Sequence, residues 1–352
     1  MTTVSIRASR SYEVKVSRGL LDTLGAETAA LLKGRTAAIV SDSNVAPLYL
    51  DKTKASLEQA GFRVCSFVFP AGEASKDGQT YLELLEFLAE HQITRSDGLV
   101  ALGGGVVGDL TGFAAATFLR GVNFIQIPTT LLAAVDASVG GKTAIDLKNG
   151  KNLAGAFYQP RLVLCDLNTL DTLPAEIFAD GCAEVIKYGM IGDPDLLDLL
   201  ETTDFQKDPE EIVARCVAQK RDLVEQDEFD TGVRQLLNLG HTIGHGIEAC
   251  SGYQLSHGKA VAIGMTLITR AAVAFGLCPA ETLPRLQSLL KKYHLPDATD
   301  YEAQALYEKA LSDKKRTGST IRLVVPTAWG KSQLHQVAVP DLLQWIEKGL
   351  SL

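Results

Sequence analysis

The segment RQLLNLGHTIGH, residues 234–245, places polar side chains at helical spacing on an apolar background. The four polar residues of interest are Arg234, Asn238, His241 and His245. Steps of four, three and four residues put all of them on one face of a helix predicted over 234–250. Gly240, Gly244 and Gly246 each weaken a helix by roughly 1 kcal/mol relative to Ala, so another group is expected to approach the backbone. Solvated faces favour Lys, Glu and Gln, which makes a binding site the better interpretation.

The histidines of this segment have the spacing of metal ligands. His241 and His245 lie one helical turn apart, and His257 follows in LSHGKAV near the start of another expected helix. Two histidines at this spacing can share a metal ion, and buried or capped histidines are the alternative. The remaining ligand should be a carboxylate. GCAEVIKYG offers Glu184 inside an apolar helix, with Lys187 one turn on, but spacing alone does not connect it to the histidines.

A basic residue interrupts the apolar face of the helix predicted over 208–227. Lys220 lies in the stripe formed by Val213, Cys216, Val217, Leu223 and Val224. Its side chain either extends outward along that face or points into a cleft toward an anion. Because Arg234 begins the next expected helix, the two basic residues are candidates for binding one anion.

A strand that runs into a glycine-rich turn is predicted in GLVALGGGVVGD, residues 98–109. Gly103, Gly105 and Gly108 match G-x-G-x-x-G, and a helix is expected over 106–119. Glycines let the backbone approach a pyrophosphate, and the helix N-terminus favours its charge. The motif therefore predicts a dinucleotide site, with a purely structural tight turn as the alternative.

The stretch 129–155 combines charged and amide side chains with many small residues. It reads as a long glycine-rich loop that carries Asp136, Lys142, Lys151 and Asn152. Lysines flanked by glycines in such a loop suggest anion binding, and ordinary surface lysines are the alternative. A P-loop is excluded, because Asp136 stands where G-x-x-x-x-G-K-[ST] requires its first glycine.

Two domains are expected to position these residues. Strands are predicted at 12–16, 36–42, 62–69, 98–104, 123–128 and 161–167, and the clearest amphipathic helix covers 77–93. Helices follow Pro174, at about 176–190, 208–227, 234–250, 258–276, 281–293 and 300–312, then a strand at 320–325 and a helix at 340–349. We therefore expect an α/β Rossmann-like domain over 1–174 with a mostly parallel sheet, and an all-α domain over 175–352. The cleft between them is the expected active site.

The composition is that of a soluble globular protein. Its 352 residues are 46% hydrophobic and 22% charged, which suits two domains. A net charge of −8 argues against nucleic acid as a partner. No apolar run is long enough for a membrane span, and the first residues lack the apolar core of a signal peptide. Six scattered cysteines without a CxxC pair favour free thiols in a reducing cytoplasm.

Together these segments resemble the 3-dehydroquinate synthase family of sugar phosphate cyclases, which are related to iron-dependent alcohol and glycerol dehydrogenases. The matching blocks, within residues 73–316, are GGGVVGDLTGF, RGVNFIQIPTTLLAAVDASVGGKTAID, GKNLAGAFYQP, GCAEVIKYG, LLNLGHTIGHGIE, LSHGKAVAIGM and DKK. One departure is LPAEIF at 173–178, where the family usually has an Arg-Glu pair before the Phe. Because of that departure, a cofactor contact is not carried over to Glu176.

The resemblance implies the identity of the site residues. NAD+ would be bound by Asp42, Asn44, Glu73, Lys76, Gly104, Gly105, Asp109, Thr129, Thr130, Lys142, Lys151 and Thr172. A divalent cation, Zn²⁺ or Co²⁺, would be held by Glu184, His241 and His257, whereas spacing alone favours His241 with His245. The substrate phosphate would meet Lys142, Asn238, His245 and either Lys314 or Lys315, with Arg120 reaching it across a homodimer interface. Lys220 and Arg234 would bind the carboxylate, and Asp136, Lys151, Asn152 and Lys187 the hydroxyls and metal-linked groups. The expected catalytic residues are His245, Lys142, Lys187, Asp136 and Asn152.

The implied activity converts 3-deoxy-D-arabino-heptulosonate 7-phosphate (DAHP) to 3-dehydroquinate and phosphate, a lyase step of the shikimate pathway of aromatic amino acid biosynthesis. Transient oxidation by NAD+ is expected to precede β-elimination of phosphate, re-reduction, ring opening and aldol closure. A doubly anionic sugar acid needs a basic pocket, which the lysines and Arg234 would supply. The alternatives are another sugar phosphate cyclase, a metal-dependent alcohol or glycerol dehydrogenase, and a non-catalytic nucleotide-binding protein.

Overall fold

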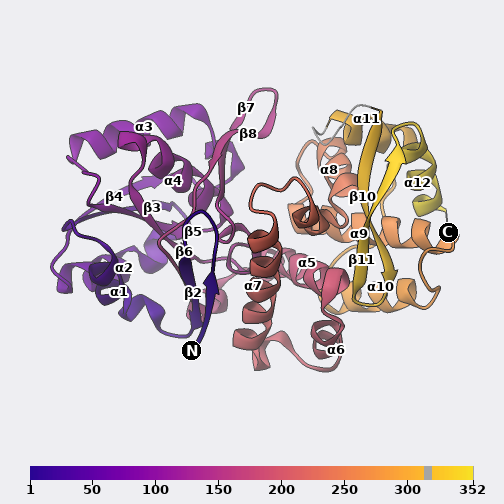
Figure 1. The fold of residues 1–352 in the computed structure, drawn as a ribbon, viewed down its shortest axis with the longest axis horizontal. Coiled ribbons are helices and arrows are strands. Elements are labelled where there is room, and N and C mark those ends of the chain that lie inside the picture. The colour runs from indigo at the N-terminus through magenta and orange to yellow at the C-terminus, as the bar shows by residue number, and fades with distance from the viewer. Residues whose placement is uncertain (313–318, 352) are drawn as a thin grey trace. The chain divides into compact units, whose positions relative to one another are not determined.

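The computed structural model describes residues 1–312 and 319–351, and these form two compact units (Figure 1). The first comprises Met1–Pro174 and Pro209–Phe229, and the second Ala175–Asp208 and Asp230–Leu352. Helix α7 (Pro209–Gln226), expected in the second domain, belongs to the first unit because it contacts β1, β2 and a π-helical turn there. Lys314 and Lys315 lie outside the described residues.

A seven-stranded sheet with the order β1-β2-β9-β6-β5-β3-β4 forms the centre of the first unit. Its strands are β1 (Thr2–Ile6), β2 (Tyr12–Ser17), β3 (Thr36–Asp42), β4 (Arg63–Phe69), β5 (Gly98–Gly103), β6 (Asn123–Pro128) and β9 (Leu162–Asp166). Strands β1 and β2 pair antiparallel, and the other neighbours pair parallel. The predicted mostly parallel sheet is confirmed, with β1 as an additional edge strand.

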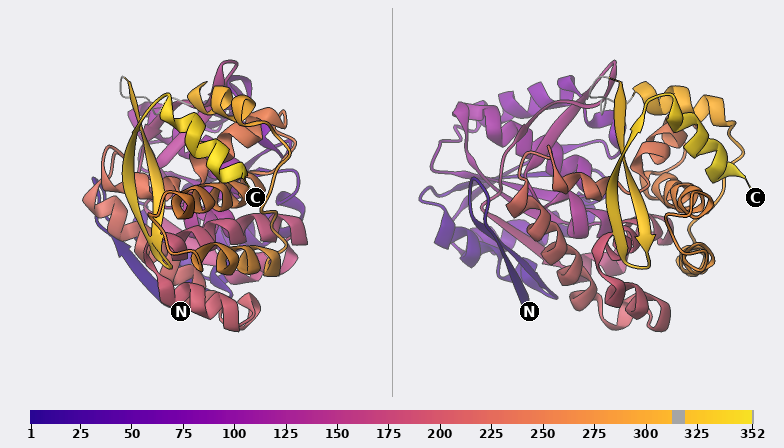
Figure 2. Two further views of the ribbon diagram at one scale, coloured as in Figure 1. Left: turned by 90° about the vertical axis from the view of Figure 1, so that its right-hand side faces the viewer. Right: turned by 45° about the vertical axis from the view of Figure 1, so that its right-hand side comes forward.

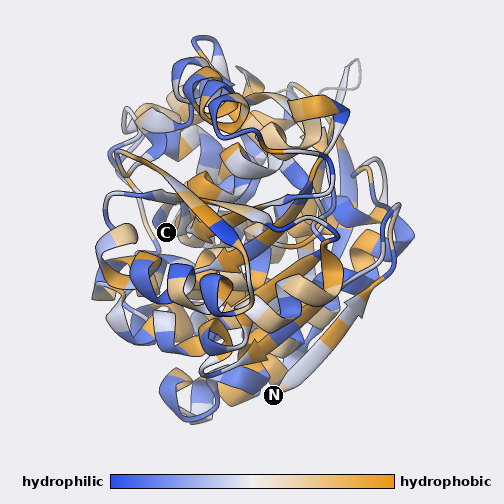
Figure 3. Cartoon of the chain, turned by 90° about the vertical axis from the view of Figure 1, so that its left-hand side faces the viewer, coloured by the Kyte–Doolittle hydropathy of each residue, from blue (hydrophilic) through white to orange (hydrophobic). Residues whose placement is uncertain are grey.

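Helices cover both faces of this sheet, which explains why β3 and β5 are nearly continuous apolar runs. The helices are α1 (Leu24–Leu31), α2 (Ala46–Gln59), α3 (Gly78–Glu90), α4 (Gly105–Thr117) and α7. Val40 packs in one cluster with Leu84 of α3, and the preceding Ile39 packs in another with Leu57 of α2. Figure 3 shows hydrophobic strands in the interior and helices of mixed hydropathy around them. Alternate residues of a strand thus support two separate cores.

The stretch 129–155 is folded rather than a long loop, which corrects the expectation from its glycines. Residues Ala133–Ala137 form a π-helical turn, η4, and β7 (Lys142–Leu147) pairs antiparallel with β8 (Gly150–Phe157). A side chain at Gly155 would collide with the Thr143 carbonyl oxygen. The glycine that suggested a loop is therefore needed for close contact between the strands.

The second unit is mostly helical, but it is not all-α. Its helices are α5 (Ala175–Gly192), α6 (Pro194–Thr202), α8 (His241–Cys250), α9 (His257–Ala274), α10 (Thr282–Lys292), α11 (Ala303–Ser312) and α12 (Asp341–Leu350). A hairpin of β10 (Thr320–Ala328) and β11 (Lys331–Ala338) packs against α5, α9 and α12 (Figure 2). Among the described residues, no helix combines the length and apolar character needed to cross a bilayer.

The helix predicted over 234–250 is broken, which corrects the single polar face inferred from spacing. Residues Val233–Asn238 form a 3-10 helix, η7, and Gly240 adopts φ 78° before α8 begins at His241. A Cβ at Gly240 would lie 2.7 Å from the Val261 oxygen of α9, and one at Gly246 would lie 3.0 Å from the Leu306 oxygen of α11. The groups that approach these glycines are therefore neighbouring helices.

Candidate active site

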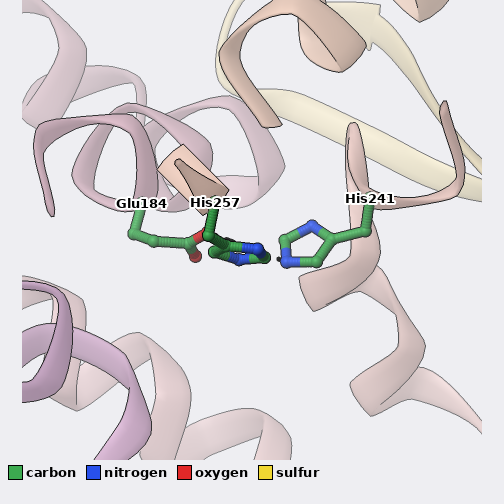
Figure 4. A group of neighbouring side chains, drawn as sticks. All are labelled: Glu184, His241 and His257. Atoms are coloured by element: carbon green, nitrogen blue, oxygen red, sulfur yellow. Dashed lines mark ion pairs between the residues drawn. The ribbon is translucent and has the colours of Figure 1, made fainter. Parts of the chain in front are cut away.

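Three side chains from separate helices of the second unit converge on one point (Figure 4). Glu184 comes from α5, His241 is the first residue of α8, and His257 is the first residue of α9. The Nε2 atoms of His241 and His257 lie 3.7 and 3.5 Å from Glu184 Oε1. Potential ligand atoms of all three residues lie within 4.8 Å of one another. Two imidazoles and a carboxylate are ligands typical of Zn²⁺ and Co²⁺ sites.

The environment of Glu184 fits a bound cation. Its side chain is fully buried, and its two carboxylate oxygens face two imidazoles and one lysine. Lys187, one turn along α5, forms an ion pair with Oε2. A buried carboxylate is stable only when cations or donors compensate its lost hydration. A divalent cation between Glu184 and the two imidazoles would provide that compensation.

The second ring nitrogen of each histidine has its own partner. His241 Nδ1 lies 3.1 Å from the Leu239 carbonyl oxygen, and His257 Nδ1 lies 3.4 Å from Glu248 Oε2. When Nδ1 donates to these acceptors, Nε2 is the ring nitrogen that faces Glu184 and would bind a metal. Sequence reasoning did not identify Glu248. Its signal was a carboxylate two helical turns after His241, close to the apolar Ile243 and Ile247.

Protonation of His257 competes with metal binding. Burial lowers its pKa, but hydrogen bonds and charges of Glu184 and Glu248 outweigh burial and raise the pKa to about 10. In the metal-free site, His257 is therefore a protonated imidazolium at neutral pH, with a proton on each ring nitrogen. A cation must displace one of these protons, because only the neutral imidazole is a ligand.

Other expected residues of the second unit lie on or beside these helices. Arg234 is 1% exposed in η7, which contacts α5, β10 and β11. Asn238 donates to the Gln235 carbonyl oxygen at 3.1 Å. His245 is half-buried, and its Nε2 lies 4.0 Å from Glu248 Oε2. The His241–His245 pair favoured by spacing is therefore not the grouping that meets Glu184. Glu176, the position of the sequence departure, is 84% exposed.

In the first unit, the glycine-rich turn lies at the carboxyl ends of adjacent parallel strands. Ser41 of β3 pairs with Leu102 of β5, and Gly103 pairs with Pro128 of β6. The residues that follow these pairs are Asp42, Gly104 and Thr129, and Asn44, Gly105 and Thr130 follow one or two positions later. This edge is where open α/β sheets bind ligands. The Thr129 hydroxyl is buried there without a hydrogen-bond partner among the described residues.

A buried lysine links this turn to the β7–β8 hairpin. Lys76 Nζ lies 2.6 Å from Asp109 Oδ2 of α4 and donates to Asn152 Oδ1 at 2.6 Å, and Glu73 Oε1 is 3.8 Å away. Burial lowers the pKa of Lys76, but the charges of Asp109 and Glu73 outweigh burial and raise it. Lys76 is thus a fixed positive charge beside the glycine-rich helix.

The remaining expected residues of the first unit have different environments. Lys220 is buried and pairs with Asp136 of η4, so it does not extend outward from α7. Lys142, at the start of β7, is exposed and Lys151 is half-buried. Arg120 is exposed with φ 65°, and the hydroxyl of Thr172 lies 2.5 Å from that of Tyr49.

Comparisons with known sequences cover almost the whole chain. The family models 3-dehydroquinate synthase N-terminal and 3-dehydroquinate synthase C-terminal match residues 66–180 and 181–316. The 3-dehydroquinate synthase of Streptococcus suis (strain 05ZYH33) is 43% identical over 343 residues, 96% of this chain and 97% of the relative. That of Enterococcus faecalis (strain ATCC 47077 / OG1RF) is 42% identical over 346 residues, 97% of each chain.

Solved structures share the fold over the same extent. A 2-deoxy-scyllo-inosose synthase complexed with carbaglucose-6-phosphate, NAD+ and Co2+ has a TM-score of 0.88 and 26% identity, covering 99% of this chain and 100% of that chain. ValA, a 2-epi-5-epi-valiolone synthase from Streptomyces hygroscopicus subsp. jinggangensis 5008 with NAD+ and Zn2+ bound, has a TM-score of 0.87 and 26% identity, covering 98% of each chain. An iron containing alcohol dehydrogenase, 15% identical with a TM-score of 0.66 and 98% and 99% coverage, shares the fold alone. With both family models matched and two near-full-length relatives above 40% identity, the chain belongs to the 3-dehydroquinate synthase family.

Proposed function

We propose that this protein is a lyase that converts DAHP to 3-dehydroquinate and inorganic phosphate in the shikimate pathway of aromatic amino acid biosynthesis. The observation that carries the proposal is the convergence of Glu184, His241 and His257 in a chain of this family. A buried carboxylate that faces two imidazoles is typical of a catalytic or metal site, and nucleotide binding alone does not require it.

NAD+ and a divalent cation are the proposed cofactors, and the two sugar phosphate cyclases described above hold NAD+ with Co2+ or Zn2+. The proposed NAD+ contacts are Asp42, Asn44, Glu73, Lys76, Gly104, Gly105, Asp109, Thr129, Thr130, Lys142, Lys151 and Thr172. Glu184, His241 and His257 are the proposed metal ligands. When bound, NAD+ supplies reversible hydride exchange at a substrate alcohol and the cation supplies a Lewis acid.

Basic and amide side chains bind the two anionic ends of the substrate in this proposal. Arg234 is buried, and its planar guanidinium suits a two-point contact with the carboxylate, to which Lys220 adds positive charge. Lys142, Asn238 and His245 bind the phosphate. The substrate hydroxyls and the groups linked to the metal are contacted in this proposal by Asp136, Lys151, Asn152 and Lys187.

Loss of phosphate requires a proton acceptor. The carbon next to the oxidised centre loses its proton, the C–H electron pair forms a C=C bond, and phosphate leaves with the C–O pair. We assign proton transfer to His245, whose half-buried imidazole lies near Glu248. The substrate phosphate is the alternative acceptor. Lys142 stabilises the charge of the departing phosphate.

The proposal also includes assembly of the protein as a homodimer and its location in the cytoplasm. Arg120 and the adjacent Leu119 are exposed and both have positive φ, 65° and 51°. Such a strained exposed pair suits a role at an interface, where Arg120 would reach the phosphate bound by the partner protomer. All six cysteines are free thiols, as is typical of a reducing compartment.

Release of inorganic phosphate from DAHP tests the proposal directly. We expect phosphate release that requires NAD+, is abolished by a chelator and returns with Zn²⁺ or Co²⁺, without net accumulation of NADH. Steady NADH formation from glycerol would instead indicate a dehydrogenase. Carbocycle formation from another sugar phosphate, with DAHP inert, would indicate a different cyclase. An intact NAD-bound protein that releases no phosphate from DAHP would support a non-catalytic role.

A further inference from the structure

Glu248 is a buried carboxylate to which the proposed function gives no role. It is 5% exposed on α8, and its Oε2 lies 3.4 Å from His257 Nδ1 and 4.0 Å from His245 Nε2. The first distance allows a hydrogen bond and the second is longer than one. Burial of an ionised carboxylate is costly unless a donor or a positive charge compensates it. The contact with His257 therefore indicates a role for Glu248 beside that imidazole.

Helix geometry brings this carboxylate to the metal ligands. His241 and Glu248 lie two turns apart on α8, on the same face. His257 begins α9, and α9 approaches α8 closely because Gly244 and Gly264 lack side chains. A Cβ at Gly244 would lie 3.1 Å from the Ala260 oxygen. Helix α8 therefore presents both a ligand and an acceptor for the ligand on α9.

The two imidazoles differ in the charge of their acceptors. His241 Nδ1 meets the neutral carbonyl of Leu239, whereas His257 Nδ1 meets a carboxylate. A carboxylate acceptor fixes the tautomer and the ring orientation, and it makes the opposite nitrogen a stronger donor to a metal. His257 Nε2 already faces Glu184 Oε1 at 3.5 Å, which is the direction that a shared cation requires.

We propose that Glu248 is a positioning residue of the metal centre, which accepts the Nδ1–H of His257 and directs Nε2 toward the cation held with Glu184 and His241. The inference rests on the proposed function, because it presupposes that metal site. Glu248 acts through His257 and does not itself bind the cation.

Metal affinity in the absence of substrate and NAD+ provides the test. Full-length metal-free protein is titrated with Zn²⁺ against a chromophoric chelator, and the visible spectrum of the Co²⁺ form is recorded. Glu248→Ala should raise the Zn²⁺ Kd roughly 10- to 100-fold and shift the Co²⁺ bands. Glu248→Gln should lose less Zn²⁺ affinity than Glu248→Ala, because the amide oxygen of Gln can still accept a hydrogen bond from Nδ1–H of His257. Ser251→Ala is the matched control, because the Ser251 hydroxyl donates to the backbone oxygen of Glu248 and not to its carboxylate. Its Kd should equal that of the wild type.

The remaining outcomes decide against the proposal. Wild-type affinity and an unchanged Co²⁺ spectrum in Glu248→Ala would overturn it. If Glu248→Ala does not fold, the same result in Glu248→Gln would overturn it. Loss of one of two bound metal equivalents would also overturn it, because Glu248 would then be a ligand, as the cluster of His245, Glu248 and His257 permits. A wild-type protein that binds no Zn²⁺ would instead contradict the proposed function.

Discussion

Lys220 of α7 forms an ion pair with Asp136 of the π-helical turn, although 84 positions separate them in the sequence. The Lys220 ammonium also donates to the Asp136 carbonyl oxygen at 2.6 Å. Single π-helical turns are frequent at functional sites. The pair fixes both a cation and a carboxylate that we propose to act on the substrate, so a change in either residue should affect folding and substrate binding together.

Lys220→Met should lower both stability and substrate affinity. Removal of one partner of a buried ion pair typically costs about 3–5 kcal/mol, and the partial exposure of Asp136 reduces this to about 2 kcal/mol. Urea unfolding measures the loss, and the KM for DAHP should rise. The control is Lys54→Met, because Lys54 and its partner Glu58 are both well exposed. Equal stability of the two variants would show that the pair contributes nothing.

His241→Ala should abolish metal binding and phosphate release. The remaining Glu184 and His257 offer too few ligands to retain Zn²⁺, and turnover should fall at least about 100-fold. Metal content of the purified protein is measured by elemental analysis alongside the phosphate assay. His294→Asn is a suitable control, since His294 is exposed and Asn tolerates its φ of 58°. Full zinc content with full activity in His241→Ala would refute the metal assignment.

The stability of the metal-free protein should depend on the protonation of His257. Its folded-state pKa of about 10 lies above the ordinary value of 6.5, so its contribution is fully present below pH 6.5 and is lost as pH rises through about 10. After allowance for partial exposure, we expect a loss of about 1–2 kcal/mol between these limits. Urea unfolding of the wild type and His257→Gln at several pH values measures it. The pH dependence of the wild type should exceed that of the variant, and Zn²⁺ affinity of the wild type should rise over the same range.

Lys76→Met should weaken NAD+ binding. Lys76 is the buried cation between Asp109, Glu73 and Asn152, beside the glycine-rich helix. Its loss leaves two carboxylates near a pyrophosphate site, so we expect the NAD+ Kd to rise about tenfold, since one tenfold step corresponds to about 1.4 kcal/mol. Calorimetric titration measures the Kd, with exposed Lys148→Met as the control. An unchanged Kd in Lys76→Met would place the pyrophosphate elsewhere.

Apolar patterns predicted the sheet well because its central strands are buried on both faces. Strand β5 is buried at every position and is visible as GLVALG. Strand β11, KSQLHQVA, is mostly polar and only partly buried, so its sequence resembles a loop. Its pairing with β10 depends on contacts with α5 and α12, which no local pattern records. Long-range packing therefore determines the elements that the sequence did not reveal.

The site was predictable by residue type more than by spacing. A regular helix through 234–250 would align Arg234 with His245, but the αL conformation of Gly240 breaks it. Glu184 meets His241 only because α9 packs against both α5 and α8. The family resemblance named that trio, whereas spacing favoured His241 with His245, and His245 is not in the group that contains Glu184. Glu248 was visible as a carboxylate close to apolar residues, a signal that periodicity alone could have raised.

Gly264→Ala should reveal how far helix packing controls the metal site. In an unobstructed helix this change stabilises a protein by about 0.4–1 kcal/mol, but a Cβ at Gly264 would collide with the Gly240 carbonyl oxygen. Separation of α8 from α9 should therefore lower stability by about 1–3 kcal/mol and weaken Zn²⁺ binding, because His241 and His257 lie on these two helices. Gly78→Ala is the matched control, since a Cβ at Gly78 would meet no neighbouring atom within 4 Å. Thermal unfolding with chelator-competition titration distinguishes the effects: a Gly264→Ala variant as stable as Gly78→Ala, with unaltered Zn²⁺ affinity, would show that the α8–α9 contact does not set the geometry of the site.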